Sequence, residues 1–132
     1  MTEPTPCPCG SGKPYSDCCE PLISGAQTAA SPEALMRSRY TAYTLGRGDY
    51  LHETWHPTTR RGELDLGEPV SWLGLKILRT EDGGVTDSRG LVEFVARYRV
   101  EGRAHRLHEI SRFQRRRGRW VYVDGEPGPT AR

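Results

Sequence analysis

The chain of 132 residues contains no asparagine, only two lysines and only two phenylalanines. It also has no apolar run close to the roughly 18 residues that a membrane-spanning helix requires, which excludes a helical membrane protein and predicts no contact with a membrane. The first six residues lack the basic and apolar regions of a secretory signal, so we expect a cytoplasmic protein. Hydrophobic residues still make up 35% of the sequence, which is enough for a folded core.

Arginine is the residue in excess, and it supplies 17 of the 19 basic side chains. The charge is divided unevenly along the chain. Residues 1–31 contain Lys13 as their only basic residue and three acidic residues, for a net charge of −2, whereas the remainder carries +4. This division, together with the length, predicts a small module at 1–31, one domain at 32–126 and a flexible tail at 127–132.

Two helices are expected at the start of the larger domain. Ser31 is a good N-cap, Pro32 suits the first helical position, and Gly46 follows the last residue with helical spacing. A second, short helix is expected over 49–55, capped by its first residue, an aspartate. Residues 58–69 contain two glycines and a proline and are expected to form a loop.

After residue 70, apolar residues alternate with polar ones, which is the period of a β-strand. Turn-forming pairs separate the candidate strands, among them Glu101-Gly102 and Arg117-Gly118. Two helices followed by an antiparallel meander predict an α+β fold in which the helices pack on one face of the sheet. The candidate strands cover residues 71–79, 91–100, 105–114 and 119–124.

The expected register places polar residues on the sheet face that meets the helices. A two-residue hairpin pairs even-numbered positions of the second strand with odd-numbered positions of the third. Burial of the resulting polar groups is costly unless they find partners. The polar set predicted for this inner face is His105, Glu109, Ser111 and Asp124.

This inner face suggests a ligand pocket. Within it, Glu109 and His105 are the candidates for acid–base chemistry, although no complete catalytic set stands out. Alternatively, the polar groups form an internal network in which Glu109 pairs with a histidine or an arginine. The candidate pocket residues are His56, Tyr98, His105, Glu109, Ser111 and Tyr122.

The four cysteines lie close together in the pattern C-x-C-x8-C-C. Four thiolates can hold a zinc ion in tetrahedral geometry without other ligands, and two glycines in the intervening segment let the chain fold back. We therefore expect a structural zinc site, which would supply most of the folding free energy of so small a segment. Two disulfides, a redox dithiol or unpaired thiols are the alternatives. The candidate ligands are Cys7, Cys9, Cys18 and Cys19.

Residues 52–56 read His-Glu-Thr-Trp-His and match the H-E-x-x-H pattern of zinc proteases. The context disfavours that function because Pro57 ends the helix directly after the second histidine.

The segment 97–119 contains nine arginines and two glutamates. We interpret it chiefly as a solvated outer face of the sheet. Contact of Arg97, Arg99 and Arg112 with nucleic acid, or contact of this face with an acidic protein, are the alternatives.

The cysteine segment resembles a known module. Pro8-Cys9-Gly10-Ser11-Gly12-Lys13, followed by Tyr15 and Cys18-Cys19, is similar to the SEC-C motif found at the C-terminus of the translocase motor SecA. In that family all four cysteine positions ligate zinc, and the module commonly docks on protein partners. The resemblance therefore implies the same four zinc ligands here and a protein partner.

The whole chain also resembles the bacterial YchJ-like family, which has no established biochemical activity. The resemblance rests on Pro32-Glu-Ala-Leu-Met-Arg-Ser-Arg-Tyr-Thr-Ala-Tyr, Thr54-Trp-His-Pro57, Trp72-Leu-Gly-Leu75, Val92-Glu-Phe-Val-Ala-Arg-Tyr98 and His108-Glu109-x-Ser111-x-Phe113. It implies an N-terminal SEC-C module followed by a domain similar to nuclear transport factor 2, in which a cone-like curved antiparallel sheet packs on helices.

Three functional hypotheses follow. The first is a zinc-binding adaptor whose metal module contacts a protein or ribonucleoprotein partner, with the larger domain as scaffold or homodimer surface. The second is a small-molecule binder or acid–base enzyme that uses the inner-face pocket, and the third is nucleic-acid binding through the arginines. Under the first hypothesis, the Cys9→Ser variant is expected to unfold the module and leave the larger domain intact.

Overall fold

The computed structural model describes residues 5–59 and 71–128. These residues form a short 3-10 helix (η1), three α-helices and four strands. Their bounds are η1 Tyr15–Asp17, α1 Glu20–Ile23, α2 Pro32–Leu45, α3 Gly48–Glu53, β1 Ser71–Asp82, β2 Arg89–Val100, β3 Arg103–Arg116 and β4 Arg119–Pro127.

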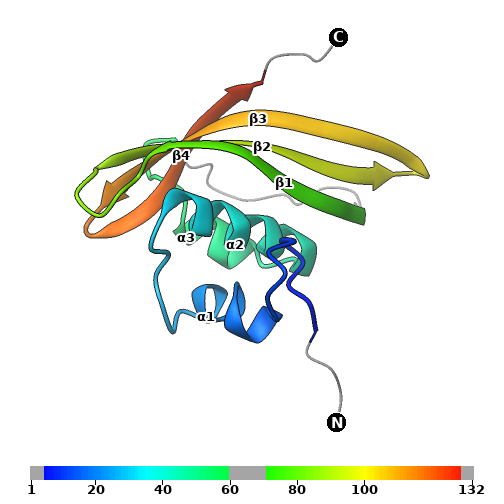
Figure 1. Ribbon diagram of the computed structural model, residues 1–132, viewed down its shortest axis with the longest axis horizontal. Coiled ribbons are helices and arrows are strands. Elements are labelled where there is room, and N and C mark those ends of the chain that lie inside the picture. Colours follow the sequence, from blue (N-terminus) through cyan, green and yellow to red (C-terminus); the bar gives the residue numbers. More distant parts are fainter. Residues whose placement is uncertain (1–4, 60–70, 129–132) are drawn as a thin grey trace.

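The four strands form one antiparallel sheet in the order β1-β2-β3-β4. The sheet is curved, helices α2 and α3 lie against its concave face, and α1 lies beyond α2 (Figure 1). This arrangement confirms the predicted α+β fold, with helices on one face of an antiparallel meander.

Helix α2 begins and ends where the sequence predicts. The Ser31 hydroxyl accepts a hydrogen bond from the backbone N–H of Ala34 at 3.1 Å, and Pro32 occupies the first turn. At the other end, Gly46 adopts a φ of 72°, a left-handed conformation that glycine adopts without strain. More than half of the helix is buried, because α3, the sheet and the N-terminal module all pack against it.

Helix α3 differs from its prediction at both ends. It begins at Gly48 with Arg47 at the N-cap position, and Asp49 lies within its first turn instead of capping it. The Asp49 carboxylate accepts two hydrogen bonds of 3.0 Å from the Arg47 guanidinium, which occupies the oxygens that a cap would use. The helix ends at Glu53, two residues before the predicted end at Trp55.

The strands are longer than the alternation of apolar residues predicts. Because the hairpin turns hold the strand ends together, pairing continues beyond the apolar positions. Pro127, which the sequence assigns to the tail, is the last residue of β4 and pairs with Glu109. Most of the loop expected at 58–69 and of the tail expected at 127–132 lies outside the described residues.

Two tight turns set the register of the sheet. Glu101 and Gly102 have φ values of 51° and 79°, and Arg117 and Gly118 have 53° and 78°. Positive φ at both central residues is typical of the two-residue turn that matches strand twist. The predicted β2–β3 register is confirmed, since Tyr98 pairs with His105 and Phe94 pairs with Glu109.

A register shift in the β3–β4 pair corrects the predicted position of Asp124. Phe113 pairs with Tyr122, but Arg112 pairs with Asp124, so β4 has one extra residue, Val123, between these partners. A bulge of this kind moves the residues after it to the opposite face. Asp124 therefore lies on the outer face, where its carboxylate accepts a hydrogen bond of 2.6 Å from the Arg112 side chain.

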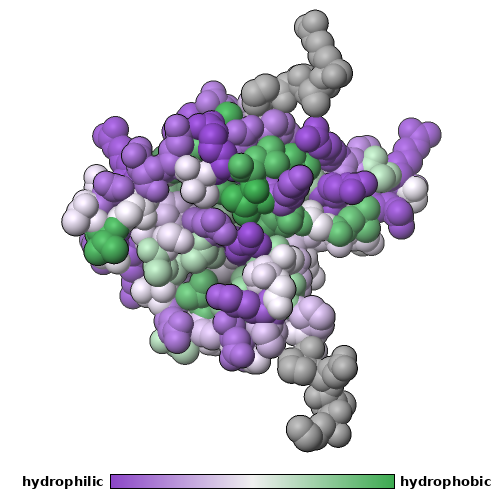
Figure 2. Space-filling model, in the orientation of Figure 1, coloured by the Kyte–Doolittle hydropathy of each residue, from purple (hydrophilic) through white to green (hydrophobic). Residues whose placement is uncertain are grey.

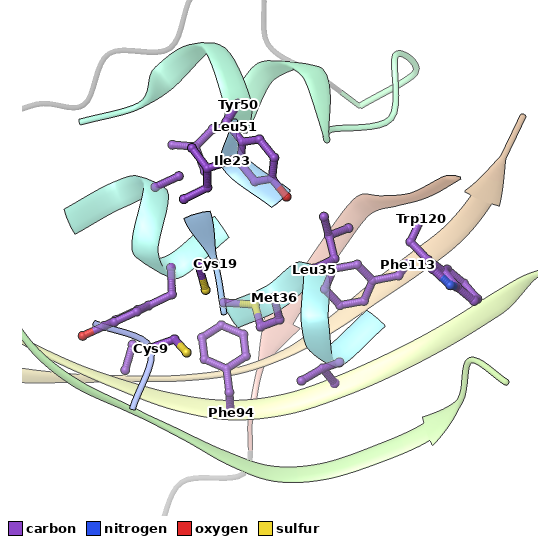
Figure 3. Close-up of a cluster of buried hydrophobic side chains, with 14 of the residues drawn as sticks. Cys9, Cys19, Ile23, Leu35, Met36, Tyr50, Leu51, Phe94, Phe113 and Trp120 are labelled. Atoms are coloured by element: carbon purple, nitrogen blue, oxygen red, sulfur yellow. The ribbon is translucent and has the colours of Figure 1, made fainter. Parts of the chain in front are cut away.

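One hydrophobic cluster joins the N-terminal module to the larger domain. Figure 3 shows Cys9 and Cys19 beside Met36 of α2 and Phe94 of β2, with Ile23 near α3. The module therefore packs into the common core, and we no longer expect it to unfold separately. The buried cluster contains Cys7, Cys9, Cys19, Ile23, Leu35, Met36, Tyr40, Ala42, Tyr50, Leu51, Val92, Phe94, Ala96, Phe113 and Trp120.

Candidate metal centre and sheet cavity

The sulfur atoms of Cys7, Cys9, Cys18 and Cys19 all lie within 4.8 Å of one another. The Cys9–Cys18 and Cys18–Cys19 sulfur distances are 3.6 and 3.9 Å. Four sulfurs arranged tetrahedrally around a metal at 2.3 Å are separated by about 3.8 Å. The cluster therefore fits a tetrahedral metal ion with thiolate ligands.

The local fold that brings the two cysteine pairs together is a tight reversal of the chain. Gly10 and Gly12 have positive φ values of 77° and 86°, which disfavour other residues at these positions. The reversal is closed by a hydrogen bond of 3.0 Å from the Cys7 N–H to the Lys13 carbonyl. It brings the first cysteine pair to the start of α1, where Cys19 is the N-cap residue.

Donors from outside the ligand set approach the sulfurs. The Thr41 hydroxyl donates to Cys19 Sγ at 3.3 Å, and the Ser11 hydroxyl lies 3.1 Å from Cys18 Sγ. Arg37 Nη1 donates to the Cys9 carbonyl at 2.9 Å and lies 3.9 Å from Cys9 Sγ. Such contacts orient thiolate ligands and stabilise their charge.

Sequence reasoning missed Arg37 and Thr41, although their spacing of four residues places them on one face of α2. Only the tertiary structure identifies this face as the one that meets the module. Through these contacts Arg37 joins the larger domain to the module at Cys9.

The thiols differ in acidity. A hydrogen bond from Cys19 lowers the pKa of Cys9 to about 4, and the same contact raises the pKa of Cys19. Burial raises the pKa of Cys18. A divalent metal that binds the four cysteines would displace their thiol protons.

The four cysteines are free thiols, which favours the metal over the two-disulfide alternative. A metal bound by all four would have no open position for substrate or water, and such closed sites are structural.

A cavity of about 270 Å³ lies between α2 and the concave face of the sheet. Three of the six predicted pocket residues line it: Glu109, Ser111 and Tyr122. The full lining is Met36, Arg39, Tyr40, Tyr43, Trp55, Trp72, Phe94, Ala96, Leu107, Glu109, Ser111 and Tyr122.

The other three predicted pocket residues do not line this cavity. His105 is exposed and stacks on Tyr98 with 5.2 Å between ring centroids. His56 follows α3, and its Nδ1 lies 2.8 Å from the Thr58 hydroxyl. Because His105 is four residues from Glu109 along β3, about 13 Å in an extended strand, the structure does not bring the two acid–base candidates together.

Glu109 is held by two neighbours. Its carboxylate accepts a hydrogen bond of 2.6 Å from the Ser111 hydroxyl. It also lies so close to Gly125 that a Cβ atom there would be 2.6 Å from the carboxyl group. No described histidine or arginine forms an ion pair with Glu109, so the predicted internal network is reduced to Ser111.

Arg39 is a cavity residue that sequence reasoning did not identify. It is only 4% exposed. Its Nη1 donates to the Leu51 carbonyl at 2.8 Å and to the Thr54 hydroxyl at 2.7 Å. The guanidinium carbon also lies 4.8 Å from the centre of the Tyr122 ring. Its position in α2 gives no sign of this role, since most arginines are exposed.

The hydroxyl of Tyr122 is a weaker acid than that of an ordinary tyrosine. Burial raises the pKa of Tyr122 to about 12, with a further contribution from the negative charge of Glu109. The phenol is therefore neutral, and able to donate a hydrogen bond, throughout the physiological pH range.

The His-Glu-Thr-Trp-His segment does not form a protease site. Helix α3 ends at Glu53, so His56 lies outside the helix that would be needed to present it beside His52. The backbone N–H of His56 donates instead to the Tyr122 carbonyl at 2.7 Å, which ties this segment to β4.

Acidic partners neutralise part of the charge on the outer sheet face. Arg112 pairs with Asp124 and Glu126 at 2.6 and 3.4 Å. Among the described residues, Arg97 and Arg99 form no ion pair, so these two keep their charge available.

A hydrophobic patch breaks the hydrophilic surface over β1 (Figure 2). The exposed large apolar residues of β1 are Leu73 and Leu78. None of the helices in the described ranges combines the length and the apolar composition needed to cross a bilayer.

Comparison with known protein families identifies the family of this chain. Residues 31–125 match the family described as YchJ, middle NTF2-like domain, and residues 5–21 match the SEC-C motif. This chain belongs to the YchJ-like family. The resemblance stated from the sequence is thereby confirmed for both parts of the chain.

Curated relatives in the family carry the designation UPF0225. The chain is 52% identical over 122 residues to a UPF0225 protein of Chromobacterium violaceum, with 90% of each chain covered. It is 49% identical over 121 residues to one of Streptomyces coelicolor, which covers 92% of this chain and 94% of that protein. These relatives are bacterial and have no assigned function in their names.

Two solved structures of SEC-C motif containing proteins share the fold. The one from Rhodopseudomonas palustris is 44% identical, covers 95% of this chain and 100% of that chain, and gives a TM-score of 0.81. The one from Psychrobacter arcticus gives a TM-score of 0.76 at 24% identity, over 97% of this chain and 85% of that chain, and supports the fold alone.

Proposed function

We propose that this YchJ-like protein is a zinc-stabilised adaptor. Its SEC-C module holds a structural zinc ion and contacts a protein or ribonucleoprotein partner, and its larger domain is the scaffold. The observation that carries the proposal is the closed set of four cysteine sulfurs, all within 4.8 Å of one another. A site with four protein ligands supports folding and surface shape, and leaves no position for catalysis.

Zinc is the metal that this ligand set favours. Thiolates select soft or borderline ions, and a tetrahedral set of four sulfurs is typical of zinc or iron–sulfur sites. The spacing of the sulfurs around one centre supports a single ion.

The surface beside the cluster has the features of a contact site. A groove of about 460 Å³ runs past Cys18 and Cys19, and its lining combines Lys13, Asp17 and Leu22 with side chains of α2. The lining thus mixes charged and apolar groups beside the turn that contains the cysteines. Interfaces of non-obligate complexes have this mixed character.

The metal is tested by its stoichiometry. We expect one zinc per chain in the purified native protein, measured by elemental mass spectrometry and by release to a chromophoric chelator after thiol modification. The Cys9→Ser variant should lose it. Ser16→Ala, a change of an exposed residue in the same module, is the matched control and should retain it. Native protein without zinc would contradict the proposal.

The adaptor role is tested by site-specific photo-crosslinking in cells. The chain has only two lysines, Lys13 in the module and Lys76 in β1, and both are exposed. A photoreactive amino acid at position 13 should give one discrete protein adduct that disappears when zinc is chelated. The same residue at position 76 is the control. Equal adducts from both positions, or none from position 13, would reject contact through the module.

A further inference from the structure

Several hydrogen-bonding groups that face the sheet cavity have no partner. Arg39 is 4% exposed, yet only its Nη1 donates to described residues, and its Nε and Nη2 donate to none of them. Tyr43 and Tyr122 line the same cavity, and their hydroxyls likewise make no hydrogen bond within the described ranges. Together with Arg39 they leave hydrogen-bond donors available to a ligand beside this cavity.

The positive charge of Arg39 indicates a ligand with a negative charge. No described carboxylate forms an ion pair with the guanidinium, and Glu109, which lines the same cavity, acts on it only through longer-range electrostatics. Burial of a cation without a directly paired counter-ion is unfavourable, and the contact with the Tyr122 ring offsets only part of that cost. The free Nε and Nη2 of an arginine form a two-pronged donor that suits a carboxylate.

The aromatic side chains that line the cavity indicate the shape and size of the apolar part of the ligand. Trp72 packs edge-on to Tyr40 with ring centroids 5.5 Å apart, and Trp55 packs in the same way on Tyr122. All four rings line the cavity. At the packing density of protein interiors, about 270 Å³ holds roughly a dozen non-hydrogen atoms. A single planar ring fits this volume and these surfaces.

The β3 side of the cavity specifies a hydrogen-bond donor on the ligand. Glu109 Oε2 accepts a hydrogen bond from the Ser111 hydroxyl, whereas Oε1 accepts none from the described residues. An ionised carboxylate only accepts hydrogen bonds, so its partner on the ligand must be a hydroxyl or an amino group.

We propose that the cavity between α2 and the sheet binds a small monocyclic aromatic carboxylate that carries a hydroxyl group. The carboxylate lies on Nε and Nη2 of Arg39, the ring lies among Trp55, Trp72 and Tyr40, and the hydroxyl donates to Glu109. This binding activity is separate from the metal module, since none of the cysteines lines the cavity.

The test is a titration of the full chain with 4-hydroxybenzoate, followed by nuclear magnetic resonance of the indole N–H signals. The protein has three tryptophans, of which Trp55 and Trp72 line the cavity and Trp120 does not. We expect saturable shifts of the first two signals, with a dissociation constant below about 2 mM, and no shift of the third. A weaker response, or equal shifts of all three signals, would overturn the proposal.

Two analogues of the ligand test its carboxylate and its hydroxyl one at a time in the unchanged protein. The neutral 4-hydroxybenzamide should bind about tenfold more weakly, because it lacks the charge for Arg39. Benzoate should also bind about tenfold more weakly, because it lacks the donor for Glu109. Equal affinity of the amide would refute the role of Arg39, and equal affinity of benzoate would refute that of Glu109.

Variants complete the test without altering the fold. Replacement of Arg39 removes contacts with Leu51 and Thr54 and risks unfolding. Glu109→Leu is therefore the decisive variant, because leucine is of similar size and has no hydrogen-bond acceptor. In it, 4-hydroxybenzoate and benzoate should bind within about twofold of each other. Arg97→Gln, on the outer face, is the control for adventitious binding of anions and should leave the affinity unchanged. If Arg97→Gln binds 4-hydroxybenzoate more weakly, the ligand binds at the outer face, and the proposal that it binds in the cavity is wrong.

Discussion

The cysteine cluster and the sheet cavity both use side chains of helix α2, but they differ in how their polar groups are satisfied. In the cluster, Ser11, Arg37 and Thr41 direct donors toward the ligand cysteines, and the sulfurs are close enough to share one metal ion. In the cavity, Arg39 and Tyr122 keep donors without partners in the described chain. The first site suits a permanent occupant and the second an exchangeable one.

A single helix serves both sites because successive residues are rotated by about 100° around its axis. Arg37 and Thr41 project toward the cysteines, whereas Met36 and Tyr40 project toward the sheet. A third face meets α3, where the hydroxyls of Ser38 and Tyr50 lie 2.7 Å apart. Because three of its faces contact other parts of the protein, α2 is buried around most of its circumference. For the same reason its apolar residues do not form a single stripe.

The largest effect is expected from removal of the metal ligand Cys9. Because Cys7, Cys9 and Cys19 belong to the common core, loss of the metal should destabilise the whole chain. We expect Cys9→Ser, or chelation of the native protein, to lower the melting temperature by more than about 15 °C in calorimetry. An unchanged melting temperature of the larger domain would restore the independent module expected from the sequence.

Arg37 should have the next largest effect, confined to the cluster. Substitution by glutamine removes the charge beside Cys9 while keeping a donor, and outer contacts of metal ligands typically alter affinity by about 10- to 100-fold. Competition with a chelator of known affinity measures this change. The matched variant Arg47→Gln, an exposed arginine paired with Asp49, should leave the metal affinity within about twofold.

On the cavity side, Gly125→Ala should disturb the position of Glu109. The new methyl group would lie 2.6 Å from the carboxyl group, which is the end of a flexible side chain and can move away. The expected cost is therefore that of the lost hydrogen bond with Ser111, about 1 kcal/mol in free energy of unfolding. Urea denaturation measures the loss. Gly48→Ala, with no atom within 4 Å of the added Cβ, is the control and should not destabilise. If Gly125→Ala destabilises the Glu109→Ala variant by the same amount, the contact with Glu109 is not the cause.

The smallest effect concerns Tyr122 at high pH. Burial raises the pKa of Tyr122 from 10.0 to about 12 in the folded chain. The stability that the neutral phenol contributes is therefore fully present below pH 10 and is lost as the pH rises through about 12. The difference in phenolate absorbance between the native protein and Tyr122→Phe should have its midpoint near pH 12. A midpoint near pH 10, the ordinary value, would show that the ring is solvated.

Features set by neighbours in the sequence could be predicted. The caps of α2, the two hairpin turns and the cysteine spacing each depend on a few adjacent residues, so the fold class, the β2–β3 register and the grouping of the four cysteines follow from the sequence. The family resemblance added the curved sheet. These features share one property, namely that local conformation decides them.

Features set by tertiary contacts could not be predicted. The extra residue Val123 leaves no mark in the apolar pattern, so Asp124 was assigned to the wrong face. Arg39 reads as an ordinary surface arginine of a helix until α3 and β4 are seen to cover it. His105 has the expected register, but the sheet extends past the helices at that end, which leaves the side chain exposed.

The most direct test of the joint core is a single unfolding experiment with two signals. All three tryptophans lie in the larger domain and all four cysteines lie in the module, so tryptophan fluorescence and zinc release report on the two parts separately. In urea, we predict that both signals change in one transition with a common midpoint. Release of zinc at a lower urea concentration, with the tryptophan signal still native, would contradict the joint core.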